Sequence, residues 1–509
     1  MRTSSLALAL LAVVGCSKKA DDTKSGANGS GGGEKPKVTE ATPQVKKPVD
    51  TKPLPELAAD PGGATGKAIH GTGFGGLGID APRALAVADG EAYVAGYFDG
   101  EIDFGGSIGK RTAPPGDDPK KKPSDAYVAK IGKDGKVAWV QTFGAKRDDV
   151  ANGIAIKGDH VVVVGNFLDE VKFGEFTKKS AGSDDAFVAA FSRSGEIKWA
   201  WSFGGIDSDG ANTVAATPDG GWVVGGSFMR TADFGTVQLT SRGATDAMLI
   251  KLGPGGDLEW VKQFGGAYQD SISDVTVDGQ GNIIVQGVFR DVSDWGGKDK
   301  LTAAGGADYD VVLAKYDLNG DHVWSKRYGN AFDDFAGGVT VDPAGNITMV
   351  GSFDQSVSFG EGDAHKSAGE SDIFVARFTP NGALAWARTF GADRADIADA
   401  IASDAAGNTI VTGWFENTVE FGKTSLTSKG NKDVFALKLD ANGGVVWAHR
   451  FGDKDHDQGR AVAVDEGGAA YVAGIYRFTL DAVTPALTST REENDRIPKP
   501  DTFVLKLDR

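Results

Sequence analysis

Three features of the sequence predict an all-β fold, a seven-bladed β-propeller of four-stranded antiparallel blades. First, an aromatic–glycine pair recurs every 60 to 64 residues, with its aromatic at Phe143, Phe203, Phe264, Tyr328, Phe390 and Phe451. Second, each of these aromatics has Trp four residues before it and Asp six residues after it. Third, the apolar segments are short, rich in β-branched and aromatic residues, and bounded by Gly, Asp and Asn. A fixed period indicates a repeat architecture, and four strands per period indicate a propeller blade.

Two further markers occur seven times and predict the number of blades. A hydrophobic-x-Gly-x-aromatic motif has its glycine at Gly96, Gly165, Gly226, Gly287, Gly351, Gly413 and Gly474. An aspartate opens an apolar strand at Asp125, Asp185, Asp246, Asp310, Asp372, Asp433 and Asp501. In the second unit, the expected strands are 153–156, 160–167, 186–191 and 196–203.

The N-terminal segment is expected to complete the last blade. The seventh unit ends after its third strand, whereas residues 66–76 carry the fourth-strand marker Phe74-Gly75, with Asp80 six residues later. His70 stands where the other copies have tryptophan. Pairing of this segment with residues 501–507 would remove an exposed sheet edge.

Residues that recur in every unit are first candidates for structural roles. The tryptophans are expected to pack between neighbouring blades, and both aspartate series are expected to cap turns through backbone N–H groups. Function is therefore expected where the copies differ.

Two long loops and one acidic connection differ most. From the marker glycine to the next strand's aspartate, the second-to-third-strand connection has 29 residues in the first unit and 27 in the seventh, against 20 to 23 elsewhere. These loops supply the candidate binding residues Lys120, Lys121, Lys122, Arg491, Glu492 and Glu493. The connection 453–457 enters the seventh blade on the same face. All three are expected in one sector, either as a partner-binding surface or as neutral loop growth beside the chain closure.

The acidic connection is a weak candidate for a Ca²⁺ site. Asp453, Asp455 and Asp457 follow a DxDxD pattern, but a calcium loop of the EF-hand type needs Gly at its sixth position and Glu at its twelfth. Gln458 and Val464 stand there instead. No other cofactor is expected.

No catalytic motif is evident. The six histidines show no metal-binding spacing, and the chain has no GxSxG elbow and no P-loop. The expected function is therefore non-catalytic binding of a protein or a glycan. Two alternatives stay open: a propeller enzyme, either a quinoprotein-like dehydrogenase or a glycan-cleaving enzyme that uses a hidden carboxylate pair, and an assembly scaffold of the outer membrane.

The N-terminus predicts export and lipidation. Residues 1–15 have a minimal basic start and a short apolar stretch, and Val13-Val14-Gly15-Cys16 resembles the lipobox of bacterial lipoproteins. That resemblance implies acylation of Cys16, and Ser17 implies sorting to the outer membrane, with the domain facing the periplasm or the cell surface. Residues 16–65 are Gly/Ser-rich and then Pro/Lys-rich, a composition typical of a disordered tether.

The composition limits the kinds of partner that the chain is expected to bind. The formal net charge of -16 disfavours nucleic acid and anionic lipid surfaces. The single cysteine excludes an internal disulfide. The expected partner is an envelope protein or polysaccharide, the membrane is contacted only through the lipid, and the expected state is monomeric.

The units in residues 66–509 resemble the bacterial SBBP repeat. The resemblance rests on the DxxGN turns at 278–282 and 342–346, the VxGxF strand and the GxxxW strand. It implies a propeller on a secreted or surface protein, without implying an activity. The tryptophan-bearing strand is also similar, more weakly, to quinoprotein repeats.

Overall fold

The computed structural model describes residue 57 and residues 62–116, 122–306, 308–360, 364–491 and 496–509. These residues form β-strands joined by turns, and no helix occurs among them. They include no helix long and apolar enough to cross a membrane. Cys16 and the tether at 16–56 lie outside the described residues, as do Lys120, Lys121, Glu492 and Glu493.

The strands form a β-propeller of four-stranded antiparallel meanders, each running outward from a first strand to a fourth. In chain order, the first six are: β2 (Asp80–Ala88), β3 (Glu91–Asp99), β6 (Ser124–Ile131), β7 (Val137–Phe143); β8 (Val150–Lys157), β9 (His160–Phe167), β12 (Asp185–Ser192), β13 (Ile197–Gly205); β14 (Gly210–Ala216), β15 (Trp222–Asp233), β16 (Gln238–Leu252), β17 (Leu258–Gly266); β18 (Asp270–Val277), β19 (Ile283–Phe289), β22 (Asp310–Tyr316), β23 (His322–Tyr328); β24 (Asp334–Val341), β25 (Ile347–Ser358), β26 (Ala364–Phe378), β27 (Leu384–Phe390); β28 (Ile397–Ser403), β29 (Thr409–Phe415), β32 (Asp433–Leu439), β33 (Val445–Phe451). The last is β34 (Gln458–Val464), β35 (Ala470–Tyr476), β38 (Asp501–Leu507) and β1 (Ala68–Gly76).

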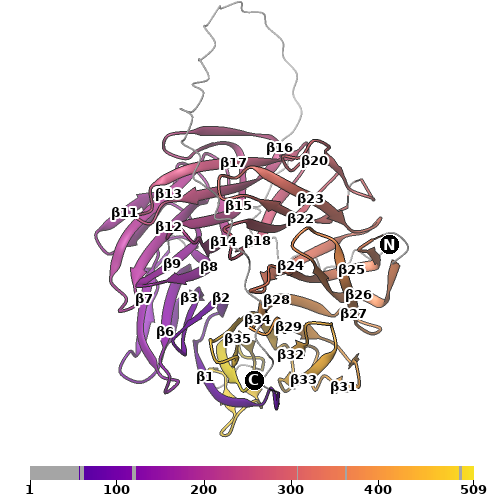
Figure 1. The fold of residues 1–509 in the computed structure, drawn as a ribbon. Helices are drawn as coiled ribbons and strands as arrows, with labels where there is room; N and C mark the ends of the chain where they lie inside the picture. Colours follow the sequence, from indigo (N-terminus) through magenta and orange to yellow (C-terminus); the bar gives the residue numbers. More distant parts are fainter. Residues whose placement is uncertain (1–56, 58–61, 117–121, 307, 361–363, 492–495) are drawn as a thin grey trace, which may run out of the picture. The chain divides into compact units, whose positions relative to one another are not determined.

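The first strands of successive meanders pack side by side. β2 packs on β8, β8 on β14, and so on to β28 on β34, and β34 packs back on β2 (Figure 1). The apolar core fills the space between neighbouring sheets. Val94 of the first sheet, for example, shares a buried cluster with Tyr471 and Val504 of the last. Each sheet therefore buries both of its faces against its neighbours.

The N-terminal strand completes the last sheet, as the sequence predicted. β1 pairs antiparallel with β38, from Ala68 opposite Leu507 to Phe74 opposite Thr502. The two segments meet in a turn that is split between the chain ends. The Asp508 carboxylate accepts hydrogen bonds from Thr65 Oγ1 at 2.5 Å and from the Lys67 N–H at 2.9 Å. Asp440 makes the corresponding bonds within the continuous turn between β32 and β33.

A hairpin that the sequence interpretation missed lies between the second and third strands. Its strands are β4 (Glu101–Asp103) with β5 (Lys110–Thr112), β10 (Glu170–Phe173) with β11 (Phe176–Lys179), β20 (Val292–Asp294) with β21 (Leu301–Thr302), β30 (Thr418–Phe421) with β31 (Thr424–Thr427), and β36 (Thr479–Leu480) with β37 (Leu487–Thr488). In the two remaining sheets, β15–β16 and β25–β26 extend into this hairpin themselves. The hairpin carries a second buried aromatic, such as Phe173, whose ring centroid is 4.9 Å from that of Phe143 in the preceding sheet.

The tryptophans pack across the sheet junctions, as predicted. Trp139 of the first sheet lies against Gly195, in the turn between the third and fourth strands of the second sheet, and its indole N–H donates to Arg193 O at 3.0 Å. Equivalent contacts join Trp199 to Gly256, Trp260 to Gly320, Trp324 to Gly382, Trp386 to Gly443 and Trp447 to Gly66. His70 meets Gly135 at the junction of the last sheet with the first.

Candidate binding site

The aspartate that follows each aromatic–glycine pair is a structural residue. Asp209 accepts hydrogen bonds from the Gly205 N–H at 2.6 Å and from the Met229 N–H at 3.0 Å, so its carboxylate joins the sheet connection to the second strand. Its copies make the same bond to the residue four positions earlier. Burial raises the pKa of Asp209 to about 7. The turn-capping prediction is therefore confirmed for this series.

The DxDxD connection is held by the protein itself. Asp457 accepts from the Asp453 N–H at 3.1 Å and from the Arg477 N–H at 2.9 Å, while Asp455 pairs with Arg477 at 3.2 Å and with His456 at 2.5 Å. Among the described residues, no three His, Cys, Asp or Glu side chains are grouped as metal ligands would be. The arrangement of Asp453, Asp455 and Asp457 thus gives the predicted Ca²⁺ site no support.

The two long loops begin on neighbouring sheets. β4 of the first loop pairs with the end of β1, where Gly75 lies opposite Asp103. Lys122 is exposed and its side chain lies against Gly100, while Arg491 is exposed in the other loop. Within the described residues, no ion pair joins Lys122 or Arg491 to Asp453 or Asp455. The other candidate binding residues, Lys120, Lys121, Glu492 and Glu493, lie outside the described residues.

The first strand of every sheet carries a β-bulge at one position, three residues after the structural aspartate. The bulged residues are Arg83, Asn152, Asn212, Ser273, Gly337, Asp399 and Arg460. A bulge often re-aims a side chain, and here it turns residues of adjacent first strands toward one another. The Asn152 amide, for example, donates across the junction to Ala211 O at 3.1 Å, and that of Asn212 to Ile272 O at 2.8 Å.

Charged residues occupy this position in three consecutive sheets. Asp399 lies on β28, Arg460 on β34 and Arg83 on β2, and the first strands of these sheets pack in that order. Burial lowers the pKa of Arg83, and the positive charge of Arg460 lowers it further. Burial raises the pKa of Asp399 to about 6, against the attraction of both arginines. We call Arg83, Asp399 and Arg460 the mouth cluster, because they lie near the strand ends from which the long loops extend.

The mouth cluster has unused hydrogen-bonding groups. The Nε atoms of Arg83 and Arg460 and Oδ2 of Asp399 are buried without a protein partner. Arg460 donates instead to Gln458 Oε1 at 2.6 Å. Among the described residues, no ion pair joins Asp399 to Arg83 or Arg460. Buried polar groups normally have partners, so these atoms are available to a water molecule or to a ligand group.

Two aromatic residues flank the cluster, each beneath a cation. The guanidinium carbon of Arg83 is 5.4 Å from the ring centroid of Tyr97, and Lys432 Nζ is 3.4 Å from that of Trp414. Other copies have Asn166, Ser227, Val288, Ser352 and Ile475 at this position of the second strand. The aromatics thus mark the same sector as the charges.

The sequence interpretation missed the mouth cluster, although a signal for it exists. The three residues stand three positions after Asp80, Asp396 and Asp457, in a column of the repeat that varies between copies and is charged only in these three. The two long loops did predict the sector that contains the cluster, because the loops belong to the first and seventh sheets and the cluster spans the sixth, seventh and first. It did not identify the residues at its centre.

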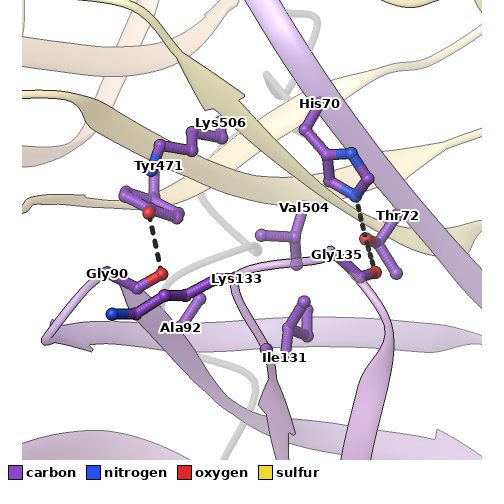
Figure 2. A pocket seen from close by; sticks show the side chains of 11 residues that line it. His70, Thr72, Gly90, Ala92, Ile131, Lys133, Gly135, Tyr471, Val504 and Lys506 are labelled. Carbon is purple, nitrogen blue, oxygen red and sulfur yellow. Dashed lines mark hydrogen bonds between the residues drawn. The ribbon is translucent and has the colours of Figure 1, made fainter.

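A small cavity lies at the opposite end of the junction between the last sheet and the first. His70 and Thr72 of β1, Lys133 and Gly135 of the β6–β7 turn, and Tyr471 line it (Figure 2). Thr72 Oγ1 donates to Gly135 O at 2.6 Å, and Tyr471 donates to Gly90 O at 3.2 Å. The cavity volume is about 20 Å³, room for one water molecule. An imidazole is smaller than the indole found at the other junctions, and this difference explains the cavity.

Comparison with known proteins gives only distant similarities. No protein-family model matches the chain. An uncharacterized WD repeat-containing protein of Acanthamoeba polyphaga mimivirus is 23% identical over 230 residues, which cover 38% of this chain and 16% of that protein. The regulatory protein FlaEY of Caulobacter vibrioides is 25% identical over 241 residues, covering 45% of this chain and 24% of that protein. The chain therefore spans less than a quarter of either relative.

Among solved structures, the Pan2 WD40 domain of Neurospora crassa has a TM-score of 0.42 at 10% identity, covering 86% of this chain and 97% of that domain. The propeller assignment rests on the strand pairing described above.

Proposed function

We propose that this protein is a lipid-anchored, seven-bladed propeller of the cell envelope that binds a partner protein without catalysis. The cyclic packing of the first strands and the pairing of β1 with β38 support a closed ring of seven blades. The sequence supports export and acylation at Cys16, with residues 16–65 as a tether to the outer membrane.

One observation supports binding more than any other. Several capping aspartates and junction tryptophans also keep one buried atom without a protein partner, but the mouth cluster is the set in which charged side chains occupy the bulge position of three adjacent sheets. It lies on the face from which both long loops extend, flanked by Tyr97 and Trp414. Charged side chains that occur at this position in only some of the copies, and that keep an unpartnered donor or acceptor, fit partner recognition better than a structural role.

Capture from envelope extracts tests this function. The bait is the full-length protein, compared with a variant that lacks residues 114–120 and 491–497. This deletion leaves β5, β37 and the buried Ser489 in place. The matched control is Lys136→Glu, which changes the charge of an exposed side chain on the opposite face, in the turn that precedes β7.

We expect the same partner to be captured by the intact protein and by the Lys136→Glu control, and to be lost or weakened in the loop deletion. Melting curves of all three must agree for the comparison to count. Capture that is lost in Lys136→Glu and kept in the loop deletion would place binding on the other face and contradict the proposal.

A further inference from the structure

We propose that Arg83 and Arg460 form a binding site for a carboxylate group of an acidic peptide segment in the partner protein. This inference rests on the proposed function and names the chemistry of its ligand. The two arginines come from adjacent first strands, β2 and β34, at the same bulge position.

The charges around the two guanidinium groups do not balance. Arg83, Arg460 and Lys432 are positive, whereas Asp399 and Glu416 are negative, so these five groups carry one excess positive charge. Glu370 also acts on Lys432, but it forms its ion pair with Arg394, at 3.5 Å. This excess occurs in a chain whose net charge is -16. A single anionic group would neutralise it.

The geometry favours a carboxylate. A guanidinium presents a planar fork of donors that matches a carboxylate, and such pairs form stronger bonds than neutral ones. Both arginines are partly buried, and each is held on one side, Arg460 by Gln458 and Arg83 by the Tyr97 ring. Little side-chain freedom would therefore be lost on binding.

The aromatic residues favour a peptide over an acidic sugar. A sugar ring would need an open aromatic face to stack on. The face of Trp414 is covered by Lys432 at 3.4 Å, and the Trp414 side chain is 7% exposed. Exposed apolar side chains lie instead at Leu77 and Ile79, on the connection that enters the first sheet on this same face. These suit contacts with a protein chain.

Fluorescence anisotropy with labelled peptides tests the proposal. The probes are a Gly/Ser peptide with several aspartates, the same peptide with asparagines, and a labelled polyuronate. Measurements use the full-length protein at physiological ionic strength, where charges are screened over about 8 Å, so that the long-range repulsion by an acidic protein is reduced.

We expect the aspartate peptide to bind and the asparagine peptide not to bind. Arg460→Gln and Arg83→Gln should each weaken binding by about tenfold or more, since a charge-assisted hydrogen bond is lost. The matched control Arg394→Gln removes an exposed arginine on the same face and should change affinity less than about twofold. Asp399→Asn should bind more tightly, because it removes a competing carboxylate.

Three results would overturn the proposal: equal losses in Arg394→Gln and Arg460→Gln, polyuronate binding without peptide binding, or unchanged affinity in both mouth variants. Arg460→Lys covers the case in which Arg460→Gln fails to fold, since it keeps the charge, loses the fork and should still bind less tightly. If capture of the partner from extracts persists while peptide binding fails, the ligand chemistry is wrong and the proposed function stands. Failure of both rejects both.

Discussion

A pair of alanine substitutions measures how much the aromatic junctions contribute to folding. Gly195 lies at a φ of 90° in the turn between β12 and β13. A β-carbon at this position would lie 2.9 Å from Cδ2 of Trp139, closer than two carbon atoms normally pack. Gly220, in the turn between β14 and β15, has the same φ of 90°, but there a β-carbon would meet Pro254 Cγ at an ordinary 3.6 Å. The two substitutions share the backbone strain and differ in the contact.

The expected magnitudes follow from these two effects. A left-handed backbone costs an alanine about 1–2 kcal/mol at either site. Crowding in a well-packed contact adds about 1–3 kcal/mol, and only Gly195→Ala incurs it. We therefore expect Gly220→Ala to lower the free energy of unfolding by about 1–2 kcal/mol and Gly195→Ala by about 2–5 kcal/mol.

Guanidinium-induced unfolding, followed by tryptophan fluorescence, provides the measurement. Gly195→Ala should also change the emission of Trp139, because its indole must move. Equal losses of stability in the two variants would refute the reasoning. They would mean that the tryptophan–glycine contact between sheets has no energetic role beyond the turn itself.

Three other predictions concern pH, the chain closure and the anchor. Burial raises the pKa of Asp80 from 3.8 to about 9, so Asp80 loses its proton at lower pH in the unfolded chain than in the folded protein, and the free energy of unfolding should fall between about pH 4 and pH 9. Urea titrations at pH 5 and pH 8 measure this fall, which Asp80→Asn should reduce. A fall that is unchanged in Asp80→Asn, or a rise of stability with pH, would contradict the assignment. Asp508→Ala removes the hydrogen bonds to Thr65 and Lys67 across the split turn, so amide hydrogen exchange should accelerate in β1. The matched change in a continuous turn, Asp440→Ala, should lower the free energy of unfolding by about 0.5–2 kcal/mol without faster exchange in β1. Equal exchange of β1 in both variants would count against the split turn. Cys16→Ala should abolish labelling with radioactive palmitate and release the protein from membranes, and membrane partitioning equal to that of wild type would contradict lipidation.

The sequence predicted features that leave a local mark in every copy. The strand meanders, the tryptophan contacts and the capping aspartates recur at fixed offsets, and the pairing of β1 with β38 followed from one marker missing at one end and present at the other. The short hairpins escaped notice because their strands have as few as two residues, as in Leu301–Thr302. Their buried aromatics, such as Phe173, nevertheless recur as a readable signal.

The mouth cluster was harder to predict because a bulge is a property of strand pairing. The local sequence around Arg83 or Arg460 does not indicate a β-bulge, in which two residues of one strand lie opposite a single residue of its neighbour. Their proximity also requires the last sheet to pack on the first, a contact between parts of the chain that are far apart in sequence. A position-by-position comparison of the repeats identifies these residues, and the structure shows that their strands pack against one another.

The split turn also determines how the domain would bear mechanical load. A force applied to the chain that precedes β1 acts on Ala68, the first residue of this strand, which lies opposite Leu507 on the face away from the mouth cluster. Tension directed along β1 shears its ladder with β38, so the hydrogen bonds from Ala68 to Phe74 resist together instead of opening one at a time. A ligand held at the mouth cluster would pull from the opposite face of the propeller. Under the proposed function, β1 is thus the strand that carries force between the N-terminal anchor and the bound partner.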